Sequence, residues 1–108
     1  MKLLTFLFLI TITILNADIE NGKDVYAQNC AFCHRTDMKG GMGKDFNLVS
    51  YSRRKEDIVK YVKDPSKMFR KFGYSANAMP KLPLNEQEIK DVSEFIDALQ
   101  PFKEWMKQ

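Results

Sequence analysis

The sequence has 108 residues, of which 44% are hydrophobic and 29% are charged, and its formal net charge is +3 at pH 7. This length predicts one small domain, which buries little core by itself. The weak net charge, and the lack of a basic run interleaved with aromatic residues, argue against a nucleic-acid-binding surface.

The first 17 residues are predicted to be an export signal. Lys2 gives a positive start, residues 3–15 form an apolar stretch containing threonines, and Ala17 is a small residue before a plausible cleavage point. Cleavage there would leave a mature domain of residues 18–108 with a net charge of +2, from 16 basic and 14 acidic residues. The apolar stretch is shorter than the about 20 residues of a transmembrane helix. We therefore expect a periplasmic domain without a membrane span; retention of the signal as an uncleaved anchor is the alternative.

A first helix is expected over residues 19–28, with Asp18 as its N-cap. Gly22 and Tyr26 are four residues apart and share one face of this helix. A glycine inside a helix costs about 1 kcal/mol relative to alanine, so Gly22 suggests a packing requirement.

The pattern Cys30-x-x-Cys33-His34 follows this helix directly and is the most informative feature of the chain. It is typical of the covalent attachment of a c-type haem. Two thiols at this spacing can each form a thioether with one vinyl group of the same porphyrin. The adjacent His34 can then bind the iron from one face. In bacteria this attachment takes place outside the cytoplasm, which agrees with an export signal.

Three other interpretations of this motif are weaker. A closed zinc site needs four ligands, and the chain has only two cysteines and one histidine. A thioredoxin-like redox pair would lie in a βαβ pattern, and no β-rich run flanks the motif. A simple disulfide would leave His34 unexplained.

The remainder is predicted as helices joined by loops. Residues 35–52, which contain three glycines, are expected to be irregular. A second helix is expected over residues 53–63 with Ser52 as its cap, followed by one or two helical turns over residues 66–72. After a loop over residues 73–84, the last helix is expected to begin at Asn85, whose spacing to Glu88 resembles a capping box, and to stop at Pro101.

The single histidine excludes two histidine ligands to one iron within a monomer. The sixth ligand is therefore expected to be a methionine or, less often, a lysine. Met79 is preferred because Pro80 restrains the backbone before it, and Met68 is the alternative. The competing role for either methionine is to fill the core.

The sequence resembles the small class I cytochromes c over essentially the whole mature domain. The resemblance rests on Gly22-x-x-x-Tyr26-x-x-x-Cys30-x-x-Cys33-His34, on Ala78-Met79-Pro80, and on a last helix carrying Ile89, Val92, Phe95, Ile96 and Leu99. It implies an all-α fold, with three to four helices wrapped around one covalently attached haem c. It further implies that Cys30 and Cys33 carry the thioethers and that His34 and Met79 are the iron ligands.

The resemblance also implies two contacts. The first and last helices would cross closely, with Gly22 and Tyr26 against Phe95. Many family members have Gly-Pro in the loop after the haem motif, and the proline carbonyl accepts a hydrogen bond from the axial histidine. This chain has Gly43-Lys44 instead. The carbonyl of Lys44 could accept the same bond, without the rigidity of proline.

Several side chains are candidates for the haem surroundings. The apolar and aromatic candidates for the pocket are Phe46, Leu48, Ile58, Tyr61, Val62, Phe69, Tyr74, Leu82 and Leu84. The candidates for contacting the propionates or the methionine sulfur are Tyr51, Arg53, Tyr74 and Asn77. Lys39, Lys71 and Lys81 could steer an acidic partner toward the exposed haem edge.

The expected function is the transfer of single electrons between periplasmic redox proteins, without enzymatic activity. One alternative is a cytochrome subunit of a periplasmic dehydrogenase, for example a sulfite-oxidising one. The tail residues Phe102, Trp105 and Met106 would favour it, because aromatic residues mark interface hot spots. The other alternative is a haem sensor or enzyme with an open sixth position.

Overall fold

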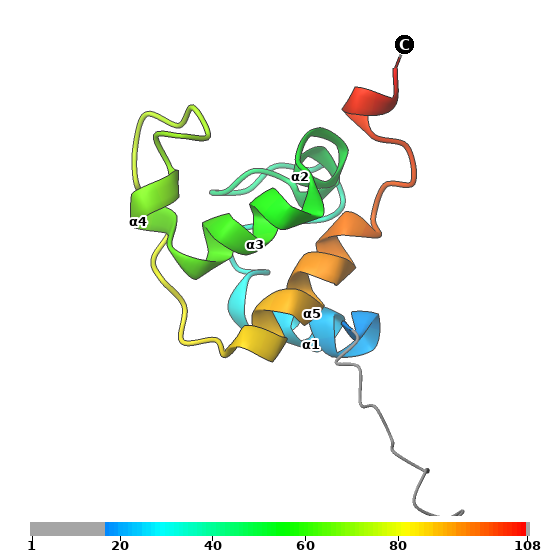
Figure 1. Ribbon diagram of the computed structural model, residues 1–108, viewed down its shortest axis with the longest axis horizontal. Helices are drawn as coiled ribbons and strands as arrows, with labels where there is room; N and C mark the ends of the chain where they lie inside the picture. The colour runs from blue at the N-terminus through cyan, green and yellow to red at the C-terminus, as the bar shows by residue number, and fades with distance from the viewer. Residues whose placement is uncertain (1–16, 108) are drawn as a thin grey trace, which may run out of the picture.

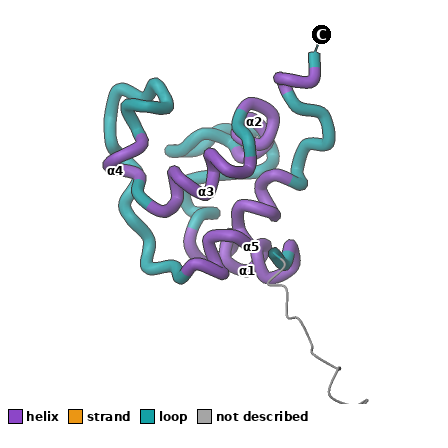
Figure 2. Tube along the Cα trace, in the orientation of Figure 1, coloured by secondary structure: helices purple, strands orange, loops and turns teal. Residues whose placement is uncertain are grey.

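The computed structural model describes residues 17–107, and these form an all-α fold without β-strands (Figures 1 and 2). The α-helices are α1 (Ile19–Asn29), α2 (Phe46–Ser52), α3 (Lys55–Lys63), α4 (Pro65–Met68) and α5 (Glu86–Asp97). A 3-10 turn, η2 (Glu104–Met106), lies near the C-terminus. The expected export signal, residues 1–17, falls almost wholly outside the described residues. None of the helices in residues 17–107 has the length and hydropathy needed to cross a bilayer.

The core is built where α5 meets α1, α2 and α3. α1 packs most extensively on α5, and α3 lies across the other side of α5 (Figure 1). The buried apolar residues at this junction are Val25, Cys30, Phe46, Ile58, Val62, Ile89, Val92 and Ile96. On the three long helices these residues have the helical spacing that the sequence shows. Burial of the apolar face of each helix therefore stabilises it.

The crossing of α1 and α5 depends on Gly22. A Cβ atom placed on Gly22 would collide with the backbone carbonyl oxygen of Asp91. It would also lie 2.6 Å from the carbonyl carbon of Asp91 and 2.9 Å from Cβ of Phe95. The ring of Tyr26 lies 5.2 Å from that of Phe95, centroid to centroid. The expected close crossing is therefore present, and it explains why a glycine is placed inside a helix.

The helix starts follow local capping chemistry. The carboxylate of Asp18 accepts hydrogen bonds from the backbone N–H groups of Glu20 and Asn21 at the start of α1. Asn85 and Glu88 form the complete capping box at the start of α5. Both caps were expected from the sequence, because side chains of these types satisfy N–H groups that the helix itself leaves unpaired.

The stretch expected to be irregular, residues 35–52, contains helix α2 (Phe46–Ser52), so that prediction was wrong over its last seven residues. Asp45 caps this helix by accepting from Asn47 N–H, and the side chains of Phe46 and Ser50 are buried. A helix of this length gives a weak sequence signal, and tertiary burial stabilises it instead. The expected count of three to four helices is correspondingly too low.

Two boundaries also differ from expectation. Ser52 ends α2 and does not cap the next helix; α3 begins at Lys55 after Arg54, which makes no side-chain cap. The expected turns over residues 66–72 begin one residue earlier, at Pro65, and the α-helical part ends at Met68. Proline is favoured in the first turn because its missing N–H is not needed there.

The C-terminal segment after α5 is held against the body by a buried lysine. Nζ of Lys103 donates to the carbonyl oxygen and Oγ of Ser50, at 2.9 and 3.0 Å, and to the carbonyl oxygen of Asp97 at 2.6 Å. The guanidinium of Arg54 lies 4.5 Å from the ring centroid of Trp105. The tail therefore packs on its own domain through Lys103 and Trp105.

Candidate functional site

The Cys-x-x-Cys-His motif forms a tight turn at the end of α1. Cys30 is the C-cap of α1 and its N–H donates to the carbonyl of Tyr26. The N–H groups of Cys33 and His34 both donate to the carbonyl of Cys30, at 3.1 and 2.9 Å. This turn brings the two cysteines and the histidine of the motif together, and both cysteines are free thiols. Burial, with a smaller effect of Cys33, raises the pKa of the Cys30 thiol to about 11.

The imidazole of His34 is fixed by its surroundings. Nδ1 lies 2.8 Å from the carbonyl oxygen of Lys44. A carbonyl oxygen can only accept, so Nδ1 carries the proton in this bond and Nε2 is the ring nitrogen available to a ligand. The ring stacks on Phe46, with centroids 4.4 Å apart and planes inclined by 16°. The carbonyl bond expected at this position is thus made by Lys44 in place of proline.

The backbone at Gly43 lies directly against the same ring. A Cβ atom on Gly43 would clash with Cε1 of His34 and would lie only 2.6 Å from Nδ1 and 2.9 Å from Nε2. The backbone of residues 43–44 can therefore approach the imidazole only because residue 43 has no side chain. The phenol of Tyr26 adds a second tie, since its hydroxyl donates to the carbonyl of His34 at 2.8 Å.

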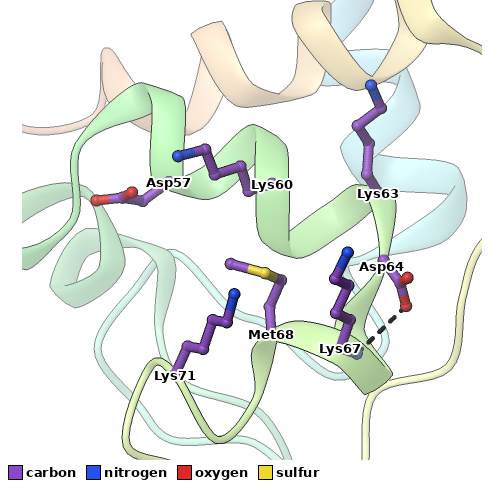
Figure 3. Close-up of a pocket in the computed structure, with 7 residues that line it drawn as sticks. All are labelled: Asp57, Lys60, Lys63, Asp64, Lys67, Met68 and Lys71. Carbon is purple, nitrogen blue, oxygen red and sulfur yellow. Dashed lines mark hydrogen bonds between the residues drawn. The ribbon is translucent and has the colours of Figure 1, made fainter.

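Met79 lies in the long loop between α4 and α5 and is partly buried. Leu82 and Leu84, which follow it, pack against the core cluster and anchor this loop. Met68 is placed differently. Its side chain lies in an open pocket on the α3–α4 face, between lysine side chains (Figure 3).

Arg53 is the most constrained of the polar candidates. Nη2 donates to the carbonyl of Phe72 at 2.7 Å, and the guanidinium lies over the rings of Phe72 and Tyr74, at 4.5 and 5.8 Å from their centroids. Nε of Arg53 is buried and has no hydrogen-bond partner in the described part of the chain. A buried, unpaired donor on a cation fits an anionic oxygen. Asn77 is exposed, and Tyr51 contacts Lys107 of the tail.

Eight of the nine expected pocket residues are at least partly buried. Phe46, Ile58 and Val62 are buried; Tyr61, Phe69, Tyr74, Leu82 and Leu84 are partly buried. Leu48 is the exception, since 42% of its surface is exposed. It lies on the outer side of α2, within the stretch expected to be irregular.

The expected surface lysines Lys39, Lys71 and Lys81 are all exposed. Lys71 belongs to a larger basic group, which surrounds the open pocket that contains Met68. The residues lining this pocket are Asp57, Lys60, Lys63, Asp64, Lys67, Met68 and Lys71 (Figure 3). Lys63 is paired with Glu86 at 2.9 Å, and the other three lysines exceed the two carboxylates of this lining, so this face of α3 and α4 is positively charged.

The protein is small and all-α, and two free thiols and a hydrogen-bonded imidazole lie at the end of its first helix. These features are typical of proteins that carry a c-type haem. The sequence profile described as Cytochrome c matches residues 19–100. The chain therefore belongs to the cytochrome c family and is a haem electron carrier whose cofactor is covalently bound haem c.

The structural comparison gives the same fold. The structure of ferricytochrome c2 from Rhodopseudomonas palustris matches with a TM-score of 0.54 and 24% sequence identity. The match covers 77% of this chain and 99% of that one. No curated protein sequence matches this chain. The expected class I cytochrome c fold is confirmed.

Proposed function

We propose that the chain is an exported, periplasmic monohaem cytochrome that carries single electrons between redox proteins. In this proposal Cys30 and Cys33 carry the thioethers, and His34 and Met79 are the axial ligands. The observation that carries it is the state of His34. Its Nδ1–H is engaged by the carbonyl of Lys44, and its Nε2 is left free as a ligand.

The bound haem supplies an iron that changes between the ferric and ferrous states by one electron. The protein determines how easily this happens. The Lys44 carbonyl fixes the tautomer and orientation of His34 and increases its basicity as a ligand. Phe46 stacks on the ring and the backbone at Gly43 lies against it, and together they hold the ring plane. A methionine as second ligand raises the reduction potential, as is usual in cytochromes c.

Arg53 is proposed to hold a carboxylate of the haem periphery. Its buried Nε is a donor without a partner in the described chain, and burying a propionate without a cation would be costly. Conversion of Arg53 to lysine would keep the charge but lose the planar, multiple-donor geometry.

Met79 is preferred to Met68 as the sixth ligand for two reasons. The loop that carries Met79 is anchored to the core by Leu82 and Leu84, which keeps the ordering cost of a weak thioether ligand low. The side chain of Met68 instead lies among four lysines on the α3–α4 face (Figure 3).

The basic face around Lys60, Lys67 and Lys71 supports an acidic redox partner, because complementary charge increases the rate of encounter. A fixed dehydrogenase subunit is the second candidate function. Trp105 is stacked under Arg54, but Phe102 and Met106 remain 75% and 55% exposed and could form a permanent interface.

Charge-reversal and truncation variants separate these two functions. For a diffusing carrier, Lys71→Glu slows electron transfer to the native partner, and the effect shrinks at high salt because charges are screened. For a fixed subunit, Phe102→Ala weakens the complex at every salt concentration. If neither variant changes the transfer rate, neither surface is the docking site.

A further inference from the structure

Asp91 is a buried carboxylate outside the haem site. It lies on α5 at the crossing with α1, and only 2% of its surface is exposed. Oδ1 accepts from the backbone N–H of Asp18 at 2.7 Å and from Nε2 of Gln87 at 2.8 Å. Oδ2 accepts from Nδ2 of Asn21, also at 2.7 Å.

All three of these donors are neutral. Buried carboxylates are normally paired with a cation, because hydrogen bonds alone offset only part of the cost of removing the charge from water. No lysine or arginine in residues 17–107 forms an ion pair with Asp91. Burial raises the pKa of Asp91, but the three hydrogen bonds outweigh it and the pKa lies below its usual value. The buried group is thus an anion without a cation.

The position of the Asp18 nitrogen suggests where the cation comes from. This nitrogen belongs to the peptide bond between Ala17 and Asp18, which is the cleavage point proposed for the export signal. Hydrolysis of that bond consumes one water, leaves the new carboxylate on Ala17, and frees the amine of Asp18, which takes up a proton. The amide N–H that lies 2.7 Å from Oδ1 of Asp91 would then become an ammonium group.

We infer that cleavage of the signal after Ala17 creates an α-ammonium on Asp18 that forms a partly buried ion pair with Asp91 and clamps α1 onto α5. This rests on the proposed export. A positive charge at a helix N-terminus is normally unfavourable because of the helix dipole. Asp91 offsets that penalty, and its bond to a neutral N–H becomes a bond between two opposite charges. The clamp lies on the same helix pair as the Gly22 crossing, so processing would tighten the contact that closes the fold.

The charged groups that the start of α1 places beside this pair are carboxylates. The carboxylates of Asp18 and Glu20 lie at the start of α1, and Gln87, which binds Asp91 from α5, is neutral. Glu94, further along α5, is paired with Lys55. The carboxylate of Asp91, with those of Asp18 and Glu20 at the helix start, would favour the charged form of the α-amino group and raise its pKa.

The test uses exported holoprotein, produced from the full-length precursor together with a haem attachment system. Intact mass identifies the first residue, and we expect Asp18. The pKa of the α-amino group is then measured from the pH dependence of its acylation rate. We expect a pKa at least one unit above the ordinary value of about 7.7–8.0, and a return toward that value in Asp91→Asn. The control Asp24→Asn removes an exposed carboxylate of α1 and leaves the pKa nearly unchanged.

A double-mutant cycle measures the coupling directly. One serine inserted between Ala17 and Asp18 moves the ammonium away from Asp91 once mass confirms the new N-terminus. With Asp91 present, we expect the insertion to increase the unfolding constant at least about fivefold, as for other contacting pairs. In Asp91→Asn the insertion has little effect.

Three results would overturn the inference. A first residue other than Asp18 would refute the cleavage point. An α-amino pKa that is the same with and without Asp91 would refute the ion pair, and so would equal effects of the insertion in both backgrounds. In the last two cases the proposed export and haem attachment would still hold, because the intact mass reports both of them.

Discussion

Replacing Gly22 by alanine tests the helix crossing on which the fold depends. An added methyl group would meet the Asp91 carbonyl and Cβ of Phe95, and its nearest obstacle is backbone, which cannot move aside as a flexible side chain would. Overpacking of this kind costs typically 1–3 kcal/mol, and a backbone obstacle points to the upper end. The better helix propensity of alanine recovers about 1 kcal/mol. We therefore expect a net loss of about 2 kcal/mol, or roughly 30-fold in the unfolding constant.

This loss is measured by denaturant unfolding of the holoprotein. It appears as a lower midpoint denaturant concentration, with the slope of the unfolding free energy against denaturant unchanged. Gly22→Val adds two further methyl groups and loses more. Lys23→Ala changes an exposed position of the same helix and is the control, with an expected change within about 0.5 kcal/mol. If Gly22→Ala is as stable as the wild type, or more stable, α1 and α5 do not cross closely at this residue and the packing argument fails.

Four further outcomes are expected. Replacing both Cys30 and Cys33 by alanine makes any bound haem extractable into acidified organic solvent, whereas wild-type haem stays with the protein; extraction from the wild type would contradict covalent attachment through this motif. Met79→Ala lowers the reduction potential and lets added imidazole bind, seen by absorption spectroscopy, whereas an unchanged potential moves the ligand elsewhere. Lys103→Met leaves buried carbonyls unpaired and costs about 1–3 kcal/mol in denaturant unfolding; no loss would mean that the tail is not clamped. The lowered pKa of Asp91 contributes stability that is present above the unfolded pKa of about 3.9 and is lost as pH falls through the folded value. In Asp91→Asn the free energy of unfolding should therefore fall less steeply as the pH is lowered at the acid end. An unchanged pH dependence would contradict this.

The sequence was most informative where chemistry is local. The Cys-x-x-Cys-His motif, the caps at Asp18 and Asn85, and the long helices could all be predicted, because spacing and capping depend on neighbouring residues. The Gly22 crossing and the Lys44 carbonyl came only with the family resemblance, and the structure provides their distances.

What could not be predicted depends on distant contacts. Helix α2 is short and exists because Phe46 and Ser50 are buried by other elements. The buried positions of Asp91 and Lys103 have no sequence signal, since both residue types are usually exposed. Their partners, the start of α1 and the α2 backbone, come from elsewhere in the chain.

The ligation of the iron is the central claim, and absorption spectroscopy with controlled potential tests it most directly. The oxidised holoprotein should show a methionine–iron charge-transfer band and a reversible one-electron transition. Met79→Ala should lose the band, and Met68→Ala should keep it. A wild-type protein without the band, or a band that survives in Met79→Ala, would contradict the assignment of His34 and Met79 as the two axial ligands.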